Sequence, residues 1–317
     1  MSHIIVTGSV AYDRIMDFQD RFREHILPDQ IHVLNVSFIL DKLEENFGGT
    51  AGNIAYNLAL VGLTPKIVSA VGSDFDRYGA HLEAHGIDTS SIKRIEGAYT
   101  AVANMITDLD DNQISAFYPG ALAHGSQVPI TNDIARDAAL VIVSPSSKQE
   151  MALRCMEARK LKIPYCFDPG QQMTTLSPEE LSHCSSDAAI VIFNDYEWQL
   201  FRSKTSHELD DLTQRGVVVV VTQGAQGSII YTKEKDYRIA PAQAGEVFDP
   251  TGAGDAYRAG IVLGFVHKWD WHQAGHLAST VASYAVEQYG TQRHAPSIAQ
   301  INQRYEDNFN EKSPLAA

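Results

Sequence analysis

The hydrophobic positions of this chain form short apolar runs separated by longer segments with helical periodicity. Runs rich in β-branched residues predict strands at 3–7, 65–71, 139–143, 164–167, 188–193 and 216–221. The segments between and after them predict helices, including one over 151–162 and one over 273–288. The run at 216–221 is the most apolar, so we expect it near the centre of a sheet. This alternation indicates an α/β fold built from βαβ units on a parallel sheet.

One part of the pattern breaks the alternation of strands and helices. Residues 100–107 and 113–118 predict two strands around Asp110-Asp111-Asn112, which is a hairpin signal. We expect this hairpin outside the main sheet, paired with a strand predicted at 31–40, as a small sheet that covers a site like a lid. Phe117 would offer an aromatic face to a flat ligand there, although packing alone also explains an aromatic residue.

The sequence Asp249-Pro250-Thr251-Gly252-Ala253-Gly254-Asp255 leads into an apolar helix. Gly252 and Gly254 allow close approach of a ligand, and the first turn of a helix offers unpaired amides that suit phosphate. A carboxylate at an anion site is unfavourable unless it acts as a base. We therefore interpret Asp255 as the group that deprotonates a hydroxyl attacking a phosphoryl group. A glycine-rich turn with an aspartate at the helix N-cap remains the alternative.

A second glycine stretch, Gly48-Gly49-Thr50-Ala51-Gly52-Asn53, opens a predicted amphipathic helix. Gly48 and Gly49 would let the backbone pass close to a substrate, and Asn53 offers a donor and an acceptor to sugar hydroxyls. Asp13 follows the first strand, where loops of α/β sheets bind ligands. A capped tight turn explains each stretch equally well as a purely structural feature.

Two further positions lie just after predicted strands. Asn194 and Glu197 are three residues apart at a helix start, which suits Mg²⁺ bound through its waters, or a capping pair. Another glycine-rich turn, with Thr222, Gly224 and Gly227, follows the run at 216–221.

Composition narrows the function classes. The chain has 317 residues, is 44% hydrophobic and carries a net charge of −14, which disfavours a nucleic-acid surface. Neither a membrane-spanning run nor a signal peptide is visible, and three cysteines without metal-ligand spacing indicate reduced thiols in a cytoplasmic protein. Gly8 stands alone after the first strand, so the G-x-G-x-x-G pattern of dinucleotide-binding oxidoreductases is absent.

Taken in order, these stretches resemble the ribokinase-like (phosphofructokinase-B type) carbohydrate kinase family over about residues 4–300. The resemblance implies a single domain over 1–317 with a three-layer fold. A central, mostly parallel sheet would have helices on both faces, and residues of about 13–47 and 98–124 would form the β lid. It also implies transfer of the γ-phosphoryl group of ATP to a hydroxymethyl group, with Mg²⁺.

The resemblance assigns roles residue by residue. Asp255 matches the catalytic base, and Gly252, Ala253 and Gly254 match the anion hole. Asp13, Gly49 and Asn53, with the neighbouring Gly48, match positions that hold the sugar. The remaining matches lie on the nucleotide and cation side: Asn194 and Glu197 for magnesium and phosphate, Thr222, Gly224 and Gly227 for the nucleotide, and Asp249 and Thr251 for a monovalent cation, which leaves activation by K⁺ open.

The lid sequence 110–121, Asp168-Pro169-Gly170-Gln171-Gln172 and the sequence 254–260 look like the nucleoside and adenosine kinase branch. We therefore expect phosphorylation of the 5′-hydroxyl of adenosine, with Phe117 stacking on the purine. A kinase of free ribose or a hexose is the alternative. A nucleoside-binding regulatory protein without catalysis is the second alternative, although an intact Asp255 argues against it. We expect a small-molecule substrate, no nucleic-acid or membrane partner, and a monomer or a homodimer.

Overall fold

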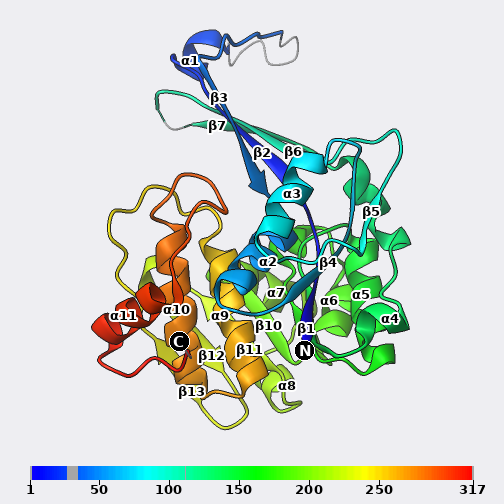
Figure 1. The fold of residues 1–317 in the computed structure, drawn as a ribbon, viewed down its shortest axis with the longest axis vertical. Helices are drawn as coiled ribbons and strands as arrows, with labels where there is room; N and C mark the ends of the chain where they lie inside the picture. Colours follow the sequence, from blue (N-terminus) through cyan, green and yellow to red (C-terminus); the bar gives the residue numbers. More distant parts are fainter. Residues whose placement is uncertain (1, 27–34, 111, 316–317) are drawn as a thin grey trace.

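The structure, a computed structural model, describes residues 2–26, 35–110 and 112–315. Its larger sheet has the order β13-β12-β11-β10-β9-β8-β1-β4-β5 (Figure 1). The strands from β5 to β11 pair in parallel, whereas β12 and β13 are antiparallel. The bounds are β1 (His3–Thr7), β4 (Pro65–Val71), β5 (Ile92–Arg94), β8 (Ala138–Val143), β9 (Tyr165–Phe167), β10 (Ile190–Asn194), β11 (Val218–Thr222), β12 (Ser228–Tyr231) and β13 (Asp236–Ile239).

The six strands predicted from apolar runs are confirmed, and so is the mostly parallel sheet. The run expected near the centre, β11, instead lies third from one edge. Its side chains are buried because β10 and β12 flank it and helices cover both faces. The burial of β11 therefore did not indicate its position in the strand order of the sheet.

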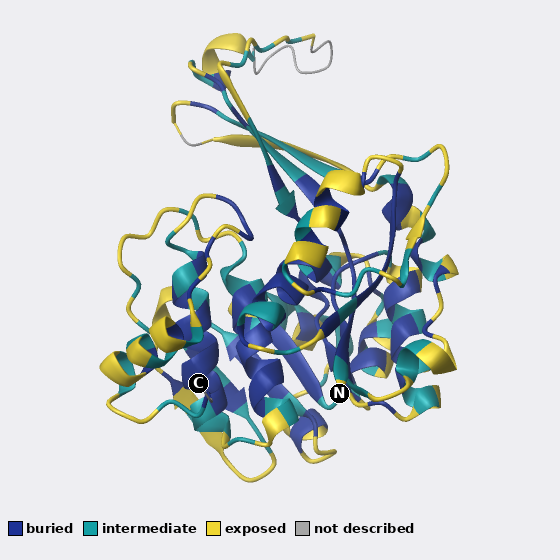
Figure 2. Ribbon diagram, viewed as in Figure 1, coloured by how far each residue is buried: buried dark blue, intermediate teal, exposed yellow. Residues whose placement is uncertain are grey.

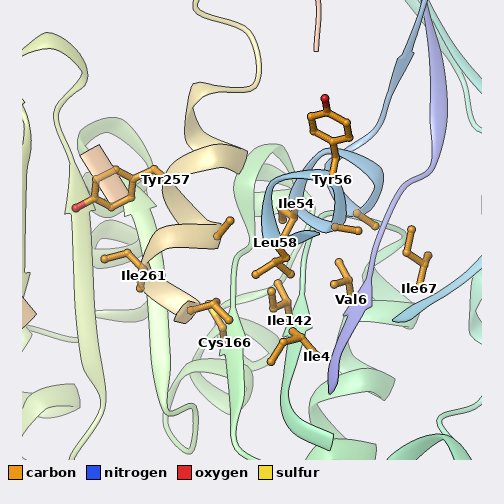
Figure 3. Packing of buried hydrophobic residues seen from close by; sticks show 14 of the residues in the cluster. Ile4, Val6, Ile54, Tyr56, Leu58, Ile67, Ile142, Cys166, Tyr257 and Ile261 are labelled. Atoms are coloured by element: carbon orange, nitrogen blue, oxygen red, sulfur yellow. The ribbon is translucent and has the colours of Figure 1, made fainter. Parts of the chain in front are cut away.

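Both faces of the sheet carry helices, as alternate residues of β1 show. Ile4 and Val6 belong to a core with α2 (Thr50–Leu60), α3 (Asp76–Ala84), α9 (Ala253–His267) and α10 (Trp271–Ala285). Ile5 points to the opposite face. It packs there with α5 (Lys148–Leu161), α6 (Pro178–Ser185), α7 (Asp195–Thr205) and α8 (Leu209–Thr213). Figure 2 shows this buried interior, and Figure 3 shows Ile54 and Leu58 of α2 beside Val6 and Ile142.

A smaller sheet projects from the body (Figure 1) and has the order β3-β2-β6-β7. Its strands are β2 (Ala11–Asp17), β3 (Lys42–Gly48), β6 (Ala101–Thr107) and β7 (Gln113–Tyr118). The predicted hairpin is confirmed as β6 and β7, which pair antiparallel outside the main sheet.

The strand predicted at 31–40 is wrong over 35–40, which has no regular structure, while 31–34 lies outside the described residues. The strand at that edge is β3, whose polar sequence KLEENFG hid it from an apolar-run criterion. Asp13, expected in a loop, lies within β2, which pairs with both β3 and β6. Cross-strand pairing on both sides explains why a segment with polar residues is extended here.

The chain does not end with the helix predicted at 273–288, which is α10. A further helix, α11 (Ile298–Phe309), follows, and sequence reasoning missed it because only Ile301 and Tyr305 are buried among its residues. The other short helices are α1 (Phe22–His25), α4 (Asn132–Ala135), η2 (Gly120–Gln127), η3 (Gly170–Thr174) and η4 (Gly224–Gln226). None of the helices described is both long and apolar enough to cross a bilayer.

Candidate active site

The first turn of α9 presents Asp255 and a set of backbone amides. Gly252 precedes the helix with a φ of +82°, a left-handed conformation that glycine adopts without strain. The Ala253 amide donates to the Pro250 carbonyl at 3.2 Å. Within the described ranges, the amides of Gly254 and Asp255 donate to no protein acceptor. Helix starts leave such donors free, and they carry the positive end of the helix dipole.

Asp255 is joined to the glycine loop before α2 by a chain of hydrogen bonds. Asn53 Nδ2 donates to Asp255 Oδ2 at 2.9 Å, and Gln292 Nε2 donates to Asn53 Oδ1 at 2.9 Å. Gln292 Nε2 also donates to the Tyr78 hydroxyl, which donates to the Gly48 carbonyl at 2.8 Å. Asn53 is therefore fixed with its amide nitrogen toward Asp255, so one residue expected on the sugar side of the site contacts the expected base, and Gly48 is linked to it through Tyr78 and Gln292.

Burial raises the pKa of Asp255 to about 7, against the lowering effects of Arg258 and the Asn53 hydrogen bond; the Asp168 and Asp13 carboxylates raise it further. Burial also raises the pKa of Asp13 to about 6, with a further contribution from Asp249. A carboxyl group with a pKa near neutrality can both accept and release a proton at physiological pH.

Asp13 lies against the glycine loop. A Cβ at Gly48 would collide with the Asp13 carboxylate, so this position requires glycine. Ala103 of β6 is in register with both Asp13 and Phe117. Directly opposed residues of a sheet point to the same face. Phe117 therefore shares the face of Asp13, and its ring is 56% exposed and open to a partner.

Asp249 holds two loops together beside this site. Its Oδ1 accepts the Thr251 amide at 2.8 Å and its Oδ2 accepts the Gly290 amide at 2.9 Å. The carboxylate expected to bind a monovalent cation thus already has a structural task. Thr251 is exposed and contributes its amide to this link.

Four of the expected nucleotide-side residues lie at the carboxyl edge of the large sheet. Asn194 ends β10 and is in register with Thr222, which ends the parallel strand β11. Gly224 and Gly227 follow in the turn before β12, both with positive φ. The carboxyl edge of a parallel sheet is where ligands bind in open α/β folds.

Asn194 and Glu197 form a reciprocal capping box at the start of α7. Asn194 Oδ1 accepts the Glu197 amide at 2.7 Å, and Glu197 Oε2 accepts the Asn194 amide at 2.8 Å. The capping interpretation of this pair is therefore confirmed. Burial raises the pKa of Glu197, the hydrogen bond from the Asn194 amide and the Arg258 charge oppose it, and the Asp168 carboxylate raises it. The Glu197 carboxyl group therefore shares the electrostatic environment of the Arg258–Asp168 pair.

Sequence reasoning gave no role to Arg258, which lies one turn after Asp255. Its Nη2 donates to Asp168 Oδ1 at 2.8 Å, and its Nε contacts Asp168 Oδ2. Asp168 is buried, and the Arg258 side chain is 12% exposed. Arg258 also covers Gly254, since a Cβ there would meet its Nη1 at 2.6 Å. A basic residue three positions after Asp255 on a largely apolar helix was the signal available in the sequence.

Asn46 is a second residue that was missed. It is in register with Asp13 across β2 and β3, and only 4% of it is exposed. Within the described residues, neither polar atom of its side chain has a hydrogen-bond partner. A buried, unpaired amide beside Asp13 is a candidate ligand for substrate.

A surface cavity of about 400 Å³ lies elsewhere. Residues of α10, α11 and the segment 243–245 line it, and none of the candidate site residues does. This cavity is therefore separate from the converging side chains and amides around Asp255.

Comparison with known proteins identifies the family to which the chain belongs. Residues 1–298 match the family described as pfkB family carbohydrate kinase. The chain is 34% identical to a nucleoside kinase of Methanothermobacter thermautotrophicus over 316 residues, covering 98% of each. The structure of a Burkholderia thailandensis nucleoside kinase in complex with inosine superposes with a TM-score of 0.87 at 35% identity, covering 98% of this chain and 99% of the other. The same kinase in complex with ADP-inosine gives a TM-score of 0.85 at 37% identity, covering 98% and 97%.

Proposed function

The chain belongs to the pfkB family of carbohydrate kinases, and from that premise we propose that it transfers the γ-phosphoryl group of ATP to the 5′-hydroxyl of adenosine. It is an ATP-dependent phosphotransferase that acts on a hydroxyl group of a nucleoside. The observation that carries the proposed chemistry is the contact between Asn53 and Asp255 at the start of α9. That contact brings a sugar-side residue and a carboxyl group of raised pKa to the same point as free helix amides.

Asp255 would accept the proton of the 5′-hydroxyl as its oxygen attacks phosphorus. The proton moves to the Asp255 carboxylate, a bond forms between the 5′-oxygen and the γ-phosphorus, and the bond to the ADP oxygen breaks. The free amides of Gly254 and Asp255 would bind charge that develops on the moving phosphoryl group. The Ala253 amide and the left-handed Gly252 would complete the turn that aims them.

The residues at the start of α7 fit a magnesium ion bound with ATP. Glu197 accepts the Asn194 amide through one carboxylate oxygen, which leaves the other oxygen for a water of the ion. When bound, Mg²⁺ would supply positive charge to the phosphates. Thr222, Gly224 and Gly227 would border the nucleotide at the same edge of the sheet.

A monovalent cation such as K⁺ would use oxygen atoms of Asp249 and Thr251. Both oxygens of the Asp249 carboxylate accept one amide each and keep further lone pairs, so the donor set is compatible with a cation.

On the nucleoside side, Asp13 and Asn53 would hold ribose hydroxyls. The absence of a Cβ at Gly48 leaves room for the Asp13 carboxylate, and at Gly49 it lets the backbone pass close to residues 9–11, so both glycines would support this side of the site. Phe117 would stack on the purine from the same face of the smaller sheet that carries Asp13. The whole chain would then be one kinase domain, and its segments 13–47 and 98–124, which contribute this sheet, would close over the sugar as a lid.

The substrate assignment is tested by measuring ADP release with adenosine, inosine, other nucleosides, ribose and fructose as acceptors. We expect adenosine to give the highest kcat/KM. Inosine is included because a related kinase was crystallised with it. A preference for inosine would support the assignment as a nucleoside kinase and contradict the assignment of adenosine as the substrate. A preference for ribose or fructose would favour the free-sugar kinase, and ADP release with none of the acceptors would favour a regulatory protein.

Replacing Asp13 with asparagine is expected to raise the KM for the nucleoside about 10- to 100-fold, because hydrogen bonds to charged groups contribute about 1.5–3 kcal/mol. The KM for ATP should change little. Asp17→Asn is the matched control, since Asp17 lies four residues further along β2 and faces the same side of the sheet. A change confined to the KM for ATP would contradict a sugar-binding role for Asp13.

The pH dependence of the reaction follows from the raised pKa of Asp255, about 7. Only the deprotonated carboxylate can act as a base. We therefore expect kcat/KM for the nucleoside to fall roughly tenfold per unit below pH 7 and to level off above it. This fall is measured from initial rates at saturating ATP, on enzyme shown to stay folded at each pH, and it forms the acidic limb of the pH profile. A midpoint near 4, the ordinary value for an aspartate, would contradict the burial of a catalytic Asp255.

A further inference from the structure

A cluster of three metal-ligating side chains lies at the start of α10, apart from the candidate active site. His272 and His276 are one helical turn apart, and Glu311 approaches them from the segment just after α11. One ligand atom of each residue lies within 4.8 Å of those of the other two. Glu311 Oε2 is 3.5 Å from His276 Nδ1, and Glu311 Oε1 is 3.8 Å from His272 Nδ1.

The His276 ring is held in place by packing, yet its Nδ1 has no hydrogen-bond partner among the described residues. The residue is 5% exposed, its ring stacks on Phe309 at a centroid distance of 3.7 Å, and the edge of Tyr305 lies beside it. Tyr305 also donates its hydroxyl to Glu311 Oε2 at 3.3 Å, which orients the carboxylate. A buried imidazole nitrogen that faces a carboxyl group at 3.5 Å and has no hydrogen-bond partner in the described part of the chain indicates a missing partner.

From this arrangement we propose that His272, His276 and Glu311 bind a divalent transition metal, with Zn²⁺ the best fit. Two imidazole nitrogens and a carboxylate oxygen are a ligand set that zinc uses, with a water or another group in the fourth position. Ligands at zinc distances in a tetrahedron lie about 3.4 Å apart. The His276–Glu311 separation of 3.5 Å is close to this value. The other separations, at most 4.8 Å, need to shorten by no more than about 1.4 Å.

The neighbours of the cluster favour a metal over a simple ion pair. The Nδ1 atoms of His272 and His276 both lie near the carboxyl group of Glu311, so the three side chains converge on one point. His272 and Glu311 are 43% and 41% exposed, which leaves a path for the ion and lets both side chains adjust.

The site would join α10 to the C-terminal segment and is distinct from the kinase centre. Gly264 of α9 packs against Ala274 of α10, and it lies two to three helical turns after Asp255, or roughly 13 Å along the helix. His272 lies beyond that contact, toward the end of α9 opposite Asp255. A metal here would therefore strengthen the attachment of α11, of which only Ile301 and Tyr305 are buried.

The test uses the full chain without an affinity tag, stripped of metal and free of nucleotide. Zn²⁺ is titrated in competition with a chromogenic chelator, and thermal unfolding is followed with and without Zn²⁺. We expect one zinc ion per chain at this site and a rise in the unfolding midpoint on the order of 5 °C when zinc is about 100-fold above its Kd.

His272→Gln and Glu311→Gln should each weaken zinc binding by at least roughly 100-fold. Loss of a residue that only hydrogen-bonds to a metal ligand already lowers metal affinity about 10- to 100-fold, and these two residues would bind the ion directly. Both residues are partly exposed, so the variants should fold, and each should lose the zinc-dependent rise. His207→Gln is the matched control, because His207 forms a similar pair with Asp211 at 3.9 Å without belonging to the three-ligand cluster. A variant that carries both His272→Gln and Glu311→Gln should bind no zinc at this site. Unchanged zinc binding in that variant, or no zinc binding by the unmodified chain, would overturn the proposal.

Discussion

Replacing Asp255 with asparagine is expected to lower kcat about 10²- to 10⁴-fold, the range for loss of a positioned general base. The change removes the charge and keeps the shape. Asn53 Nδ2, which donates to Asp255 Oδ2 at 2.9 Å, can donate equally to the amide oxygen of the new side chain. Folding and the positions of the helix amides should therefore persist, so the loss should appear in turnover and not in substrate binding.

The measurement is steady-state kinetics with adenosine and ATP varied in turn, accompanied by nucleoside titration of the same variant. Asp210→Asn is the control, because Asp210 is an aspartate in α8, outside the group of residues that surrounds Asp255. The variant should also lose the acidic limb of the pH profile, since no group with a pKa of about 7 remains at that position. Turnover within a few-fold of the unmodified enzyme would remove Asp255 from the chemical step.

The main sheet was predictable because its strands are buried on both faces and read as continuous apolar runs. β1, β4 and β8 are recognisable on that ground alone. The smaller sheet was only half predictable. Its hairpin alternates around a turn, whereas Lys42–Gly48 and Ala11–Asp17 carry polar residues on the face toward the site. Their extended form is set by cross-strand partners that are far away in the sequence, which local patterns do not encode.

The candidate site likewise has one part that the local sequence predicts and another part that depends on residues far apart in the sequence. Each glycine stretch could be found in the sequence, because glycine before a helix has a specific conformational purpose, and Gly252 does adopt a left-handed φ. The link between Asn53 and Asp255 spans 202 positions, and Gln292 reaches Asn53 across 239. Spacing within a motif carries no information on such contacts. Arg258 was overlooked for this reason, since its partner Asp168 directly follows β9, the middle strand of the large sheet, and lies 90 positions away in the sequence.

Removing the Arg258 charge is expected to be the most destabilising single substitution considered. Arg258→Met should lower the free energy of unfolding by about 3–5 kcal/mol, the usual cost of leaving one buried charge without its partner. Asp168 is 1% exposed and contacts Arg258 at two points. Without Arg258, its buried carboxylate would have neither an ion-pair partner nor contact with water. Because the Arg258 charge also lowers the pKa of Asp255, the acidic limb of kcat/KM should move to higher pH in this variant.

Urea titration of Arg258→Met, Asp168→Leu and the variant with both changes measures the free energy of unfolding of each. The three values together give the interaction energy between Arg258 and Asp168 apart from their other contacts. The double variant should be more stable than the sum of the single losses predicts, because an apolar pair leaves no buried charge unpaired. Arg202→Met is the control: Arg202 pairs with Glu208 at 2.7 Å at the surface, where such pairs contribute about 0–1 kcal/mol. If the two single losses simply add, or if Arg258→Met costs no more than the control, then Arg258 and Asp168 do not act as a buried pair. The geometry at the start of α9 must then be maintained by Asn53 and the glycine turn alone.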